Sequence, residues 1–184
     1  HAKSYYNRGI AYYNMGHKKL AIDDYTQAIS INPKHANSFY SRGLAYFDLG
    51  DLILSIDDYS NAITINPQYA LAYFQKGNIY RDLGKYKLAI ENYSNSIALD
   101  KNNSSAYNNR GNIYKKLRKY ELAIDDFSKS ILINPDEPYL YSTRGNTYYI
   151  LGKYKLAIKD YSSAIKINPK YTSAYYNRGA AKWL

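Results

Sequence analysis

Glycine recurs at a fixed step of 34 residues in this chain of 184 residues, and most other positions repeat with it. A repeat of this length is typical of stacked supersecondary units, each of which buries its apolar face only against its neighbours. It therefore overrides the one or two globular domains that the length alone would suggest. We predict one continuous solenoid over residues 1–184. Its repeats are 2–35, 36–69, 70–103, 104–137 and 138–171, with a partial sixth repeat over 172–184. The recurring glycines are Gly9, Gly43, Gly77, Gly111, Gly145 and Gly179.

Two helices are predicted in each repeat, as the third repeat illustrates. Apolar and aromatic residues follow a helical spacing from Tyr73 to Leu83 and again from Leu88 to Leu99. Gly84 lies between the two stripes and is suited to end the first helix in a tight turn. Proline near the end of a repeat cannot continue the second helix. Each repeat should thus be helix, turn, helix and stop, with the first helix covering roughly the first fourteen residues. Four repeats end in Asn-Pro, at Asn32-Pro33, Asn66-Pro67, Asn134-Pro135 and Asn168-Pro169.

Small residues recur in the helices and predict close helix contacts. A glycine in mid-helix, such as Gly77, costs about 1 kcal/mol relative to alanine, so its recurrence indicates that another helix passes too close for a side chain. Two columns of small residues in the second helices indicate the same; they are Ala21, Ser55, Ala89, Ala123, Ala157 and Ala28, Ala62, Ser96, Ser130, Ala164. Large rings are expected to fill the space between helices, at Tyr12, Tyr46, Tyr80, Tyr114, Tyr148 and at Tyr25, Tyr59, Tyr93, Phe127, Tyr161.

The pattern resembles the tetratricopeptide repeat family, known as TPR, over essentially the whole chain. The family places aromatics, glycine and alanine at fixed positions, which in the third repeat are Tyr73, Gly77, Tyr80, Ala89, Tyr93 and Ser96, with Lys101 where proline is expected. The resemblance implies an all-α, right-handed superhelical solenoid of stacked antiparallel helix pairs, with a concave face built mainly from first helices. Two features depart from the family. Arg118 stands where the other repeats have a turn glycine, and the seventh place is basic where the family is usually aliphatic.

Composition excludes several classes of protein. The chain has no cysteine, so disulfides and thiolate metal sites are ruled out. No apolar run approaches 18 residues, and no signal peptide is visible, which favours a cytoplasmic location. The chain starts without methionine and stops within a repeat, so we expect a piece of a longer protein. Its histidines lack metal-ligand spacing, and no catalytic constellation or phosphate loop is present. We therefore predict a protein that is not an enzyme, with no cofactor and no metal. The net charge of +10 favours acidic partners.

The basic column at the seventh place has two interpretations. It could be a ladder of cations that binds phosphates or acidic peptides, or it could form ion pairs with acids on the second helices. The second interpretation explains both columns at once. The basic residues are Arg8, Arg42, Lys76, Arg110, Arg144 and Arg178. The acids are Asp23, Asp24, Asp57, Asp58, Glu91, Asp125, Asp126 and Asp160.

A peptide-binding groove is the functional site that the resemblance implies. Aromatic side chains supply rigid apolar area of the kind found at binding hot spots, asparagine amides can pair with a peptide backbone, and basic residues can hold a carboxylate. The alternative is compositional, because Asn, Lys and Tyr are abundant throughout. The predicted groove residues are Tyr6, Tyr13, Tyr40, Phe47, Phe74, Asn78, Arg81, Asn109, Asn112, Lys115, Lys116 and Asn146.

The most concrete function from the sequence is a protein–protein interaction scaffold or adaptor that binds an extended peptide or a partner helix. The two-carboxylate clamp of chaperone-binding TPR domains is not matched in any three repeats, so a chaperone C-terminal tail is not the expected ligand. Two other functions stay open. Nucleic acid could bind the basic surface, which includes the cations of the inter-helix turns, or the chain could be a regulatory arm of a larger enzyme. The uncapped ends, with Trp183 at one of them, predict self-association into a dimer or a head-to-tail contact.

Overall fold

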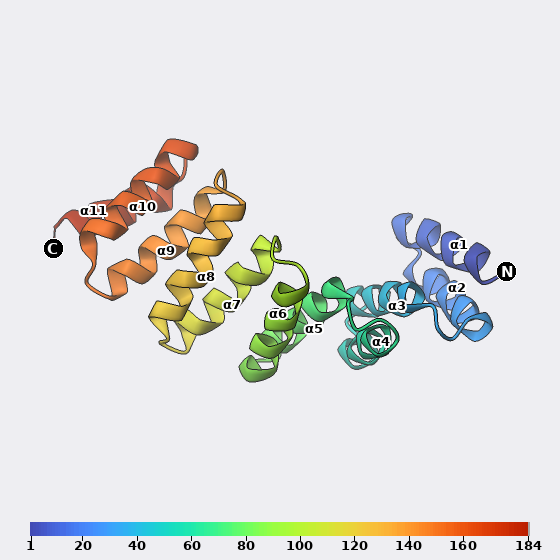
Figure 1. The fold of residues 1–184 in the computed structure, drawn as a ribbon. Coiled ribbons are helices and arrows are strands. Elements are labelled where there is room, and N and C mark those ends of the chain that lie inside the picture. The colour runs from blue at the N-terminus through green and yellow to red at the C-terminus, as the bar shows by residue number, and fades with distance from the viewer. Residues whose placement is uncertain (184) are drawn as a thin grey trace. The chain divides into compact units, whose positions relative to one another are not determined.

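A computed structural model describes residues 1–183, and Figure 1 shows them as consecutive helix pairs. Within that range the structure has eleven α-helices and no strand. The all-α fold class predicted from the repeat is confirmed. The helices gather into two compact halves, His1–Leu99 and the residues from Asp100 onward. The helices are α1 (Ala2–Asn14), α2 (Lys18–Ile31), α3 (Ala36–Asp48), α4 (Leu52–Ile65), α5 (Ala70–Asp82), α6 (Tyr86–Leu99), α7 (Ser104–Lys116), α8 (Tyr120–Ile133), α9 (Pro138–Ile150), α10 (Tyr154–Ile167) and α11 (Thr172–Lys182).

In the five complete repeats, the turn after the first helix contains a residue with left-handed backbone, which turns the chain back on itself. Four of these residues are glycines with φ between 70° and 83°, as predicted for Gly84. In the fourth repeat Arg118 adopts the same conformation, with φ of 58°. A side chain in this region costs roughly 1–2 kcal/mol. The turn is nevertheless kept, because the following amide, Lys119 N–H, still bonds to Tyr114 C=O at 2.8 Å, as Lys85 bonds to Tyr80.

The contact that fixes each helix pair is a glycine against an aromatic ring. A Cβ built on Gly9 would lie 2.7 Å from the Tyr25 ring, and one on Gly77 would lie 2.8 Å from the Tyr93 ring. The rings of this second-helix column are fully buried, and the small residues that flank them are buried with them. The close approach predicted at these glycines is thus confirmed. The group that approaches each glycine is the aromatic ring of the second helix. The other ring column, which includes Tyr12 and its equivalents, is only half-buried.

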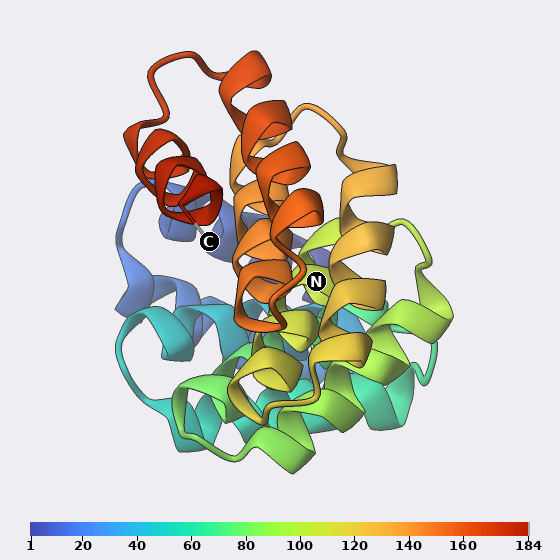
Figure 2. The same cartoon turned by 90° about the vertical axis from the view of Figure 1, so that its left-hand side faces the viewer.

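Within the described residues, the last helix packs mainly against α10. Figure 2 shows α11 beside α10, and its buried residues Ala174 and Ala181 pack into the cluster around Tyr161. The glycine of α11 differs from the five before it. A Cβ on Gly179 would meet no atom within 4 Å, because no described second helix covers it.

Ion pairs account for most of the basic column. Arg42 Nε and Nη2 each donate to a carboxylate oxygen of Asp58 at 2.8 Å. Arg8, Arg110 and Arg144 make the same fork to Asp24, Asp126 and Asp160 at 2.7–2.8 Å. The interpretation as helix–helix ion pairs therefore holds in four repeats, and a free ladder of cations is not what these arginines form.

The third repeat departs from this pairing. Lys76 takes the place of arginine and Asn92 takes the place of aspartate. Asn92 donates to Leu88 C=O at 2.8 Å instead of binding across the pair. Burial lowers the pKa of Lys76 below its ordinary value, with the charge of Glu91 acting in the opposite direction. Glu91, the acid predicted to pair with Lys76, forms no ion pair with it within the described residues.

A first prediction concerns the glycine contact. Gly43→Ala should lower the free energy of unfolding by about 1–3 kcal/mol, because the new methyl overpacks the site against the Tyr59 ring. Gly179→Ala should raise it by up to about 1 kcal/mol, because alanine is the better helix former and the space is open. Urea unfolding of both variants beside the unsubstituted protein measures this. Equal effects of the two substitutions would contradict the packing role of the glycine.

A second prediction concerns the ion pairs. Arg42→Met leaves the Asp58 carboxylate buried and unpaired, so it should cost about 3–5 kcal/mol, whereas Arg42→Met with Asp58→Leu should recover most of that loss. Burial already raises the pKa of Asp58 despite the opposing effect of Arg42. The double-mutant cycle is read by urea unfolding. A double variant as unstable as the single one would mean that the arginine acts through packing rather than through charge.

A third prediction concerns pH. Burial raises the pKa of Tyr25 and of Tyr161 to about 12 each, against about 10 for an unfolded tyrosine. The folded state therefore holds these protons more tightly than the unfolded state does. Stability should be intact below about pH 10 and lost as pH rises towards about 12. Circular dichroism followed against pH, together with tyrosinate absorbance, checks this. Ionisation of all 25 tyrosines with the helices still intact would contradict it.

Candidate peptide-binding groove and pocket

Three predicted groove aromatics in the N-terminal half turn out to belong to the packing of the helix pairs. Tyr6, Tyr40 and Phe74 lie at the same place on α1, α3 and α5. Each ring packs against the buried ring of its own second helix, with centroid distances of 6.0, 5.7 and 5.9 Å. All three are half-buried. Replacing them with alanine would thus disturb helix packing as well as any ligand contact.

Two other predicted aromatics lie near the turn ends of their helices. The Tyr13 hydroxyl on α1 donates to Asp48 Oδ2 on α3 at 2.8 Å, and Lys18 bonds to the same oxygen at 2.7 Å. Burial and then the bond to Asp48 raise the pKa of Tyr13 to about 12. Phe47 is more exposed, with 37% of its surface open to solvent. Tyr13, Lys18 and Asp48 thus bond the first repeat to the second. The ring of Phe47 takes no part in these bonds and forms an apolar surface.

The polar groove residues of α5 are also engaged. Asn78 Oδ1 accepts a hydrogen bond from the Tyr93 hydroxyl at 2.7 Å, and Asn78 Nδ2 donates to Gln75 Oε1 at 3.0 Å. Arg81 Nε donates to Asp82 at 2.8 Å. Asn78 thus supplies the partner that a buried tyrosine hydroxyl requires, and the charge of Arg81 is partly neutralised by its neighbour.

In the C-terminal half, four predicted residues lie on α7. Asn112 Nδ2 donates to the Asn108 carbonyl at 3.0 Å, one turn back along the helix. The Lys115 ammonium lies 6.0 Å from the Phe127 ring centroid, and burial lowers the pKa of Lys115. Asn109 is half-buried and Lys116 is exposed. The equivalent of Tyr93 is Phe127 in this repeat, so Asn112 has no hydroxyl to accept from and turns to its own helix instead.

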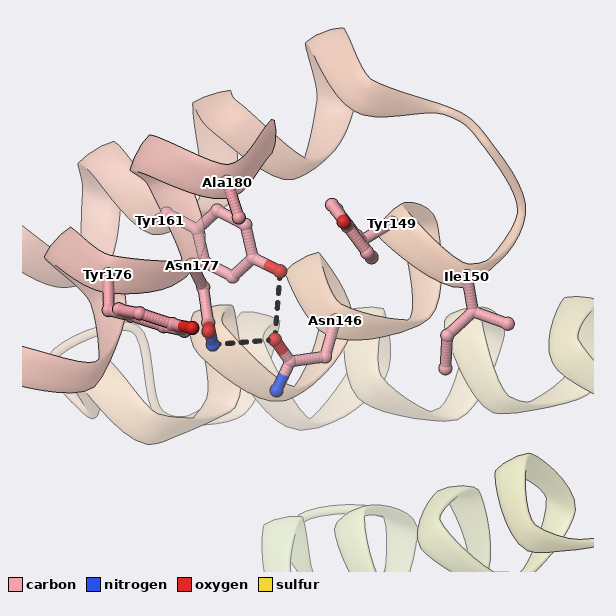
Figure 3. A pocket seen from close by; sticks show the side chains of 7 residues that line it. All are labelled: Asn146, Tyr149, Ile150, Tyr161, Tyr176, Asn177 and Ala180. Atoms are coloured by element: carbon pink, nitrogen blue, oxygen red, sulfur yellow. Dashed lines mark hydrogen bonds between the residues drawn. The ribbon is translucent and has the colours of Figure 1, made fainter. Parts of the chain in front are cut away.

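The fifth predicted residue of this half, Asn146 on α9, lies in a pocket between α9, α10 and α11 (Figure 3). Asn146 Oδ1 accepts two hydrogen bonds, from the Tyr161 hydroxyl at 2.8 Å and from Asn177 Nδ2 at 3.0 Å. These two bonds fix the amide plane. They leave the Nδ2 group of Asn146 to donate to a bound molecule.

The pocket combines this amide with apolar and aromatic walls. Figure 3 shows Tyr149 and Ile150 on one side of Asn146, with Tyr176 and Asn177 on the other. Its volume is about 370 Å³, and its lining is completed by Tyr161 and Ala180. This volume lies at the lower end of the range for ligand pockets and is enough for one or two side chains of a peptide.

The sequence analysis missed the α11 side of this pocket. Tyr176, Asn177 and Ala180 repeat the places of Tyr6, Asn7 and Ile10, so carrying the groove columns into the partial sixth repeat would have found them. Tyr176 is 79% exposed, and within residues 1–183 no second-helix ring packs on it in the way that Tyr25 packs on its equivalent Tyr6.

Residues 1–183 contain neither a metal-binding cluster nor a membrane-spanning helix. No group of three or more His, Cys, Asp or Glu side chains in that range could hold a metal ion. No helix there is long and apolar enough to cross a membrane.

The helix pairs, the recurrent glycine–ring contact and the lining of the first-helix face define a helical-repeat protein, a class that typically serves in protein–protein interaction. The chain belongs to the tetratricopeptide repeat family. One tetratricopeptide repeat model matches residues 2–35, 36–69 and 104–137, a second matches 59–91, and a TPR repeat model matches 77–118 and 145–184.

Solved structures show the same fold. MamA superimposes with a TM-score of 0.82 at 23% identity, over 90% of this chain and 96% of that chain. YrrB, described as a TPR protein with an unusual peptide-binding site, has a TM-score of 0.82 at 20% identity, over 100% of this chain and 93% of that chain. PilF of Pseudomonas aeruginosa has a TM-score of 0.79 at 16% identity, over 98% and 88%. A comparison with curated protein sequences gave no match.

A fourth prediction concerns the floor of the pocket. Tyr161→Phe removes one of the two donors to Asn146, so it should cost about 0.5–1.5 kcal/mol of stability. Tyr161→Phe with Asn146→Leu replaces both partners by apolar groups and should cost less than the sum of the single changes. Denaturant unfolding measures all three variants. Strict additivity would show that the hydroxyl and the amide are not coupled.

Proposed function

We propose that this chain is a protein–protein interaction module that binds an extended peptide along its first-helix face. The observation that carries the proposal is the pocket around Asn146. A fixed amide donor stands there between aromatic walls, in a space of about 370 Å³. The pocket accepts one apolar or aromatic side chain of the peptide, and Asn146 Nδ2 donates to the adjacent peptide carbonyl.

Physical chemistry favours a peptide as the ligand of this pocket. Tyr149 and Tyr176 offer large apolar area with little side-chain entropy to lose, which is the character of binding hot spots. An asparagine amide can both donate to and accept from a backbone, so it binds main chain whatever the sequence.

The fold of YrrB supports the proposal to a limited extent. That protein is described as having an unusual peptide-binding site, and this chain shares its fold at 20% identity. The likeness concerns the arrangement of helices. The residues that would bind a peptide here are those of this chain's own pocket.

The charges of the molecule bear on the alternative ligands. Four arginines of the basic column are bound to aspartates within their own helix pairs. These four arginines therefore do not form a row of unpaired cations that could bind phosphates. Nucleic-acid binding would rest on the turn cations, and Lys18 among these is paired with Asp48. An acidic character of the peptide follows from the net charge of +10 and stays part of the proposal.

The test begins with selection of binding peptides from a random library on the immobilised protein, followed by calorimetry on the selected peptides. Asn146→Ala and Tyr149→Ala should each weaken binding by about tenfold or more, the usual effect at a hot spot. Leu132→Ala is the matched control, because Leu132 is 80% exposed on the second helix α8.

The salt dependence separates the two ligand classes. Affinity for an acidic peptide should fall moderately between low and high salt, whereas nucleic-acid affinity would fall steeply, because many phosphate contacts are screened at once. Selected peptides whose affinity for the Asn146 and Tyr149 variants equals their affinity for the unsubstituted protein would refute the pocket as the binding site.

A further inference from the structure

The turn between α3 and α4 differs from the equivalent turns of the other complete repeats. Residues 52–54, which begin α4, are all apolar. At the place of Ile53 the other four complete repeats have a charged residue, and at the place of Leu52 they have lysine or tyrosine. Ile53 is 75% exposed, so burial within the chain does not account for an apolar residue there. The charged equivalents of Ile53 are Lys19, Lys87, Glu121 and Lys155.

Ile53 completes an apolar surface with leucines of its own turn and of the next one. Leu49 and Leu83, which directly follow α3 and α5, are 48% and 45% exposed. Together with Ile53, Leu52 and Ile56 they line a hollow of about 630 Å³. This hollow lies wholly within the N-terminal half, and both of the turns that form it belong to complete repeats. Contiguous exposed apolar surface of this kind marks interaction sites in soluble proteins.

Cations stand on both sides of this apolar surface. Lys85 lines the hollow beside Leu83, and Lys19 lies on the other side, where it lines an adjoining hollow of about 360 Å³ that also includes Leu49. Both lysines are exposed, and neither forms an ion pair within the described residues. We call these residues the Ile53 surface: Leu49, Leu52, Ile53, Ile56 and Leu83, with Lys19 and Lys85 at its sides.

The acids of these three turns are already engaged in local contacts. Asp48 is bound by Lys18 at 2.7 Å, and Asp82 is bound by its neighbour Arg81 at 2.8 Å. Asp51 accepts a hydrogen bond at 3.2 Å from a backbone N–H in the first turn of α4, so it caps that helix. The charges that remain for a ligand are therefore positive, and the complementary ligand is acidic.

The backbone of the turn favours a helix over an extended peptide as the ligand. Asp51 N–H donates to Tyr46 C=O at 2.9 Å, and Leu52 N–H donates to Gly50 C=O at 3.0 Å. The turn thus offers no strand edge, and an extended peptide would leave its own N–H and C=O groups unpaired on an apolar floor. A helix satisfies its backbone internally and presents one apolar stripe between polar edges.

We propose that the Ile53 surface binds an acidic amphipathic helix of a partner protein. Apolar side chains of the helix fill the two hollows that meet at Leu49, and acids along its edges bind Lys19 and Lys85. This site shares no residue with the pocket around Asn146, so it is a second interaction surface beside the one proposed above.

Two other occupants suit these charges less well. A second copy that paired its Ile53 surface with this one would bring lysines against lysines, in a chain whose net charge is already +10. An anionic membrane would contact neighbouring turns alike, whereas only this turn has an apolar residue at the place of Ile53, with the carboxylate of Asp51 beside it. Both occupants are included as outcomes of the test.

The probe is a display library of helical peptides randomised along one face. It is selected on the unsubstituted protein and counter-selected on the Ile53→Gln variant, which removes peptides that bind elsewhere. Ile53→Gln should leave the fold intact by circular dichroism, because the other complete repeats have polar residues at this place. The enriched peptides should carry apolar residues flanked by Asp or Glu.

Affinities of the labelled peptides are then measured by fluorescence anisotropy at low and high salt. Ile53→Gln should weaken binding by about tenfold or more, the usual effect at a hot spot. Lys19→Gln with Lys85→Gln should weaken binding and reduce its dependence on salt. Leu132→Gln is the matched control, because Leu132 is equally open to solvent on α8 and lies outside the surface. This control and Asn146→Ala should both bind as the unsubstituted protein does.

Four results would overturn the proposal. The first is that no peptide survives counter-selection, or that the survivors bind the Ile53→Gln variant with unchanged affinity. The second is enrichment of peptides without acids, whose binding does not respond to the two lysine substitutions. The third is binding to vesicles of anionic phospholipid that Ile53→Gln abolishes, which would assign the surface to a membrane. The fourth is self-association in analytical ultracentrifugation that Ile53→Gln abolishes, which would assign it to a second copy.

Discussion

The contact between a glycine of the first helix and a buried ring of the second determines how closely each helix pair can approach. A side chain of any size at Gly43 or Gly111 would displace the ring, so the helix spacing follows from the absence of one Cβ atom. The cost of a glycine in mid-helix, about 1 kcal/mol, is offset by the apolar area that a fully buried tyrosine or phenylalanine removes from water. The arginine–aspartate fork beside it satisfies an otherwise buried carboxylate and fixes the rotation of one helix against the other.

The glycine–ring contact limits which side chains are available to bind a ligand. Where the second helix has a tyrosine, its hydroxyl needs a partner, and Asn78 and Asn146 provide one. Where the second helix has Phe127, the asparagine at the same place, Asn112, is released to bond within α7. The asparagines that suggest a peptide ladder therefore also serve the buried rings. At Asn146 the oxygen is used by Tyr161 and Asn177, and the amide nitrogen is the group that the proposed peptide would bind.

The sequence predicts the helices, their turns and the close contacts, because these depend on residues that repeat and on short-range physics. Gly84 and its equivalents predict a turn, and the recurrent Gly77 predicts a close neighbour. The candidate site is predicted less well. Tyr40 and Phe74 fall in groove columns, yet their rings pack against Tyr59 and Tyr93, and the direction of a half-buried ring is decided by its neighbour in space. The pocket is only partly predicted: Tyr176 and Asn177 repeat the places of Tyr6 and Asn7, but the bond from Asn177 to Asn146 is seen only in the fold.

The third repeat shows how such an array tolerates a changed contact. Lys76 and Asn92 replace the arginine and aspartate, yet the Tyr93 ring still lies so close to Gly77 that a Cβ there would be 2.8 Å from it. The ring contact is thus sufficient to hold the pair, while the ion pair adds orientation.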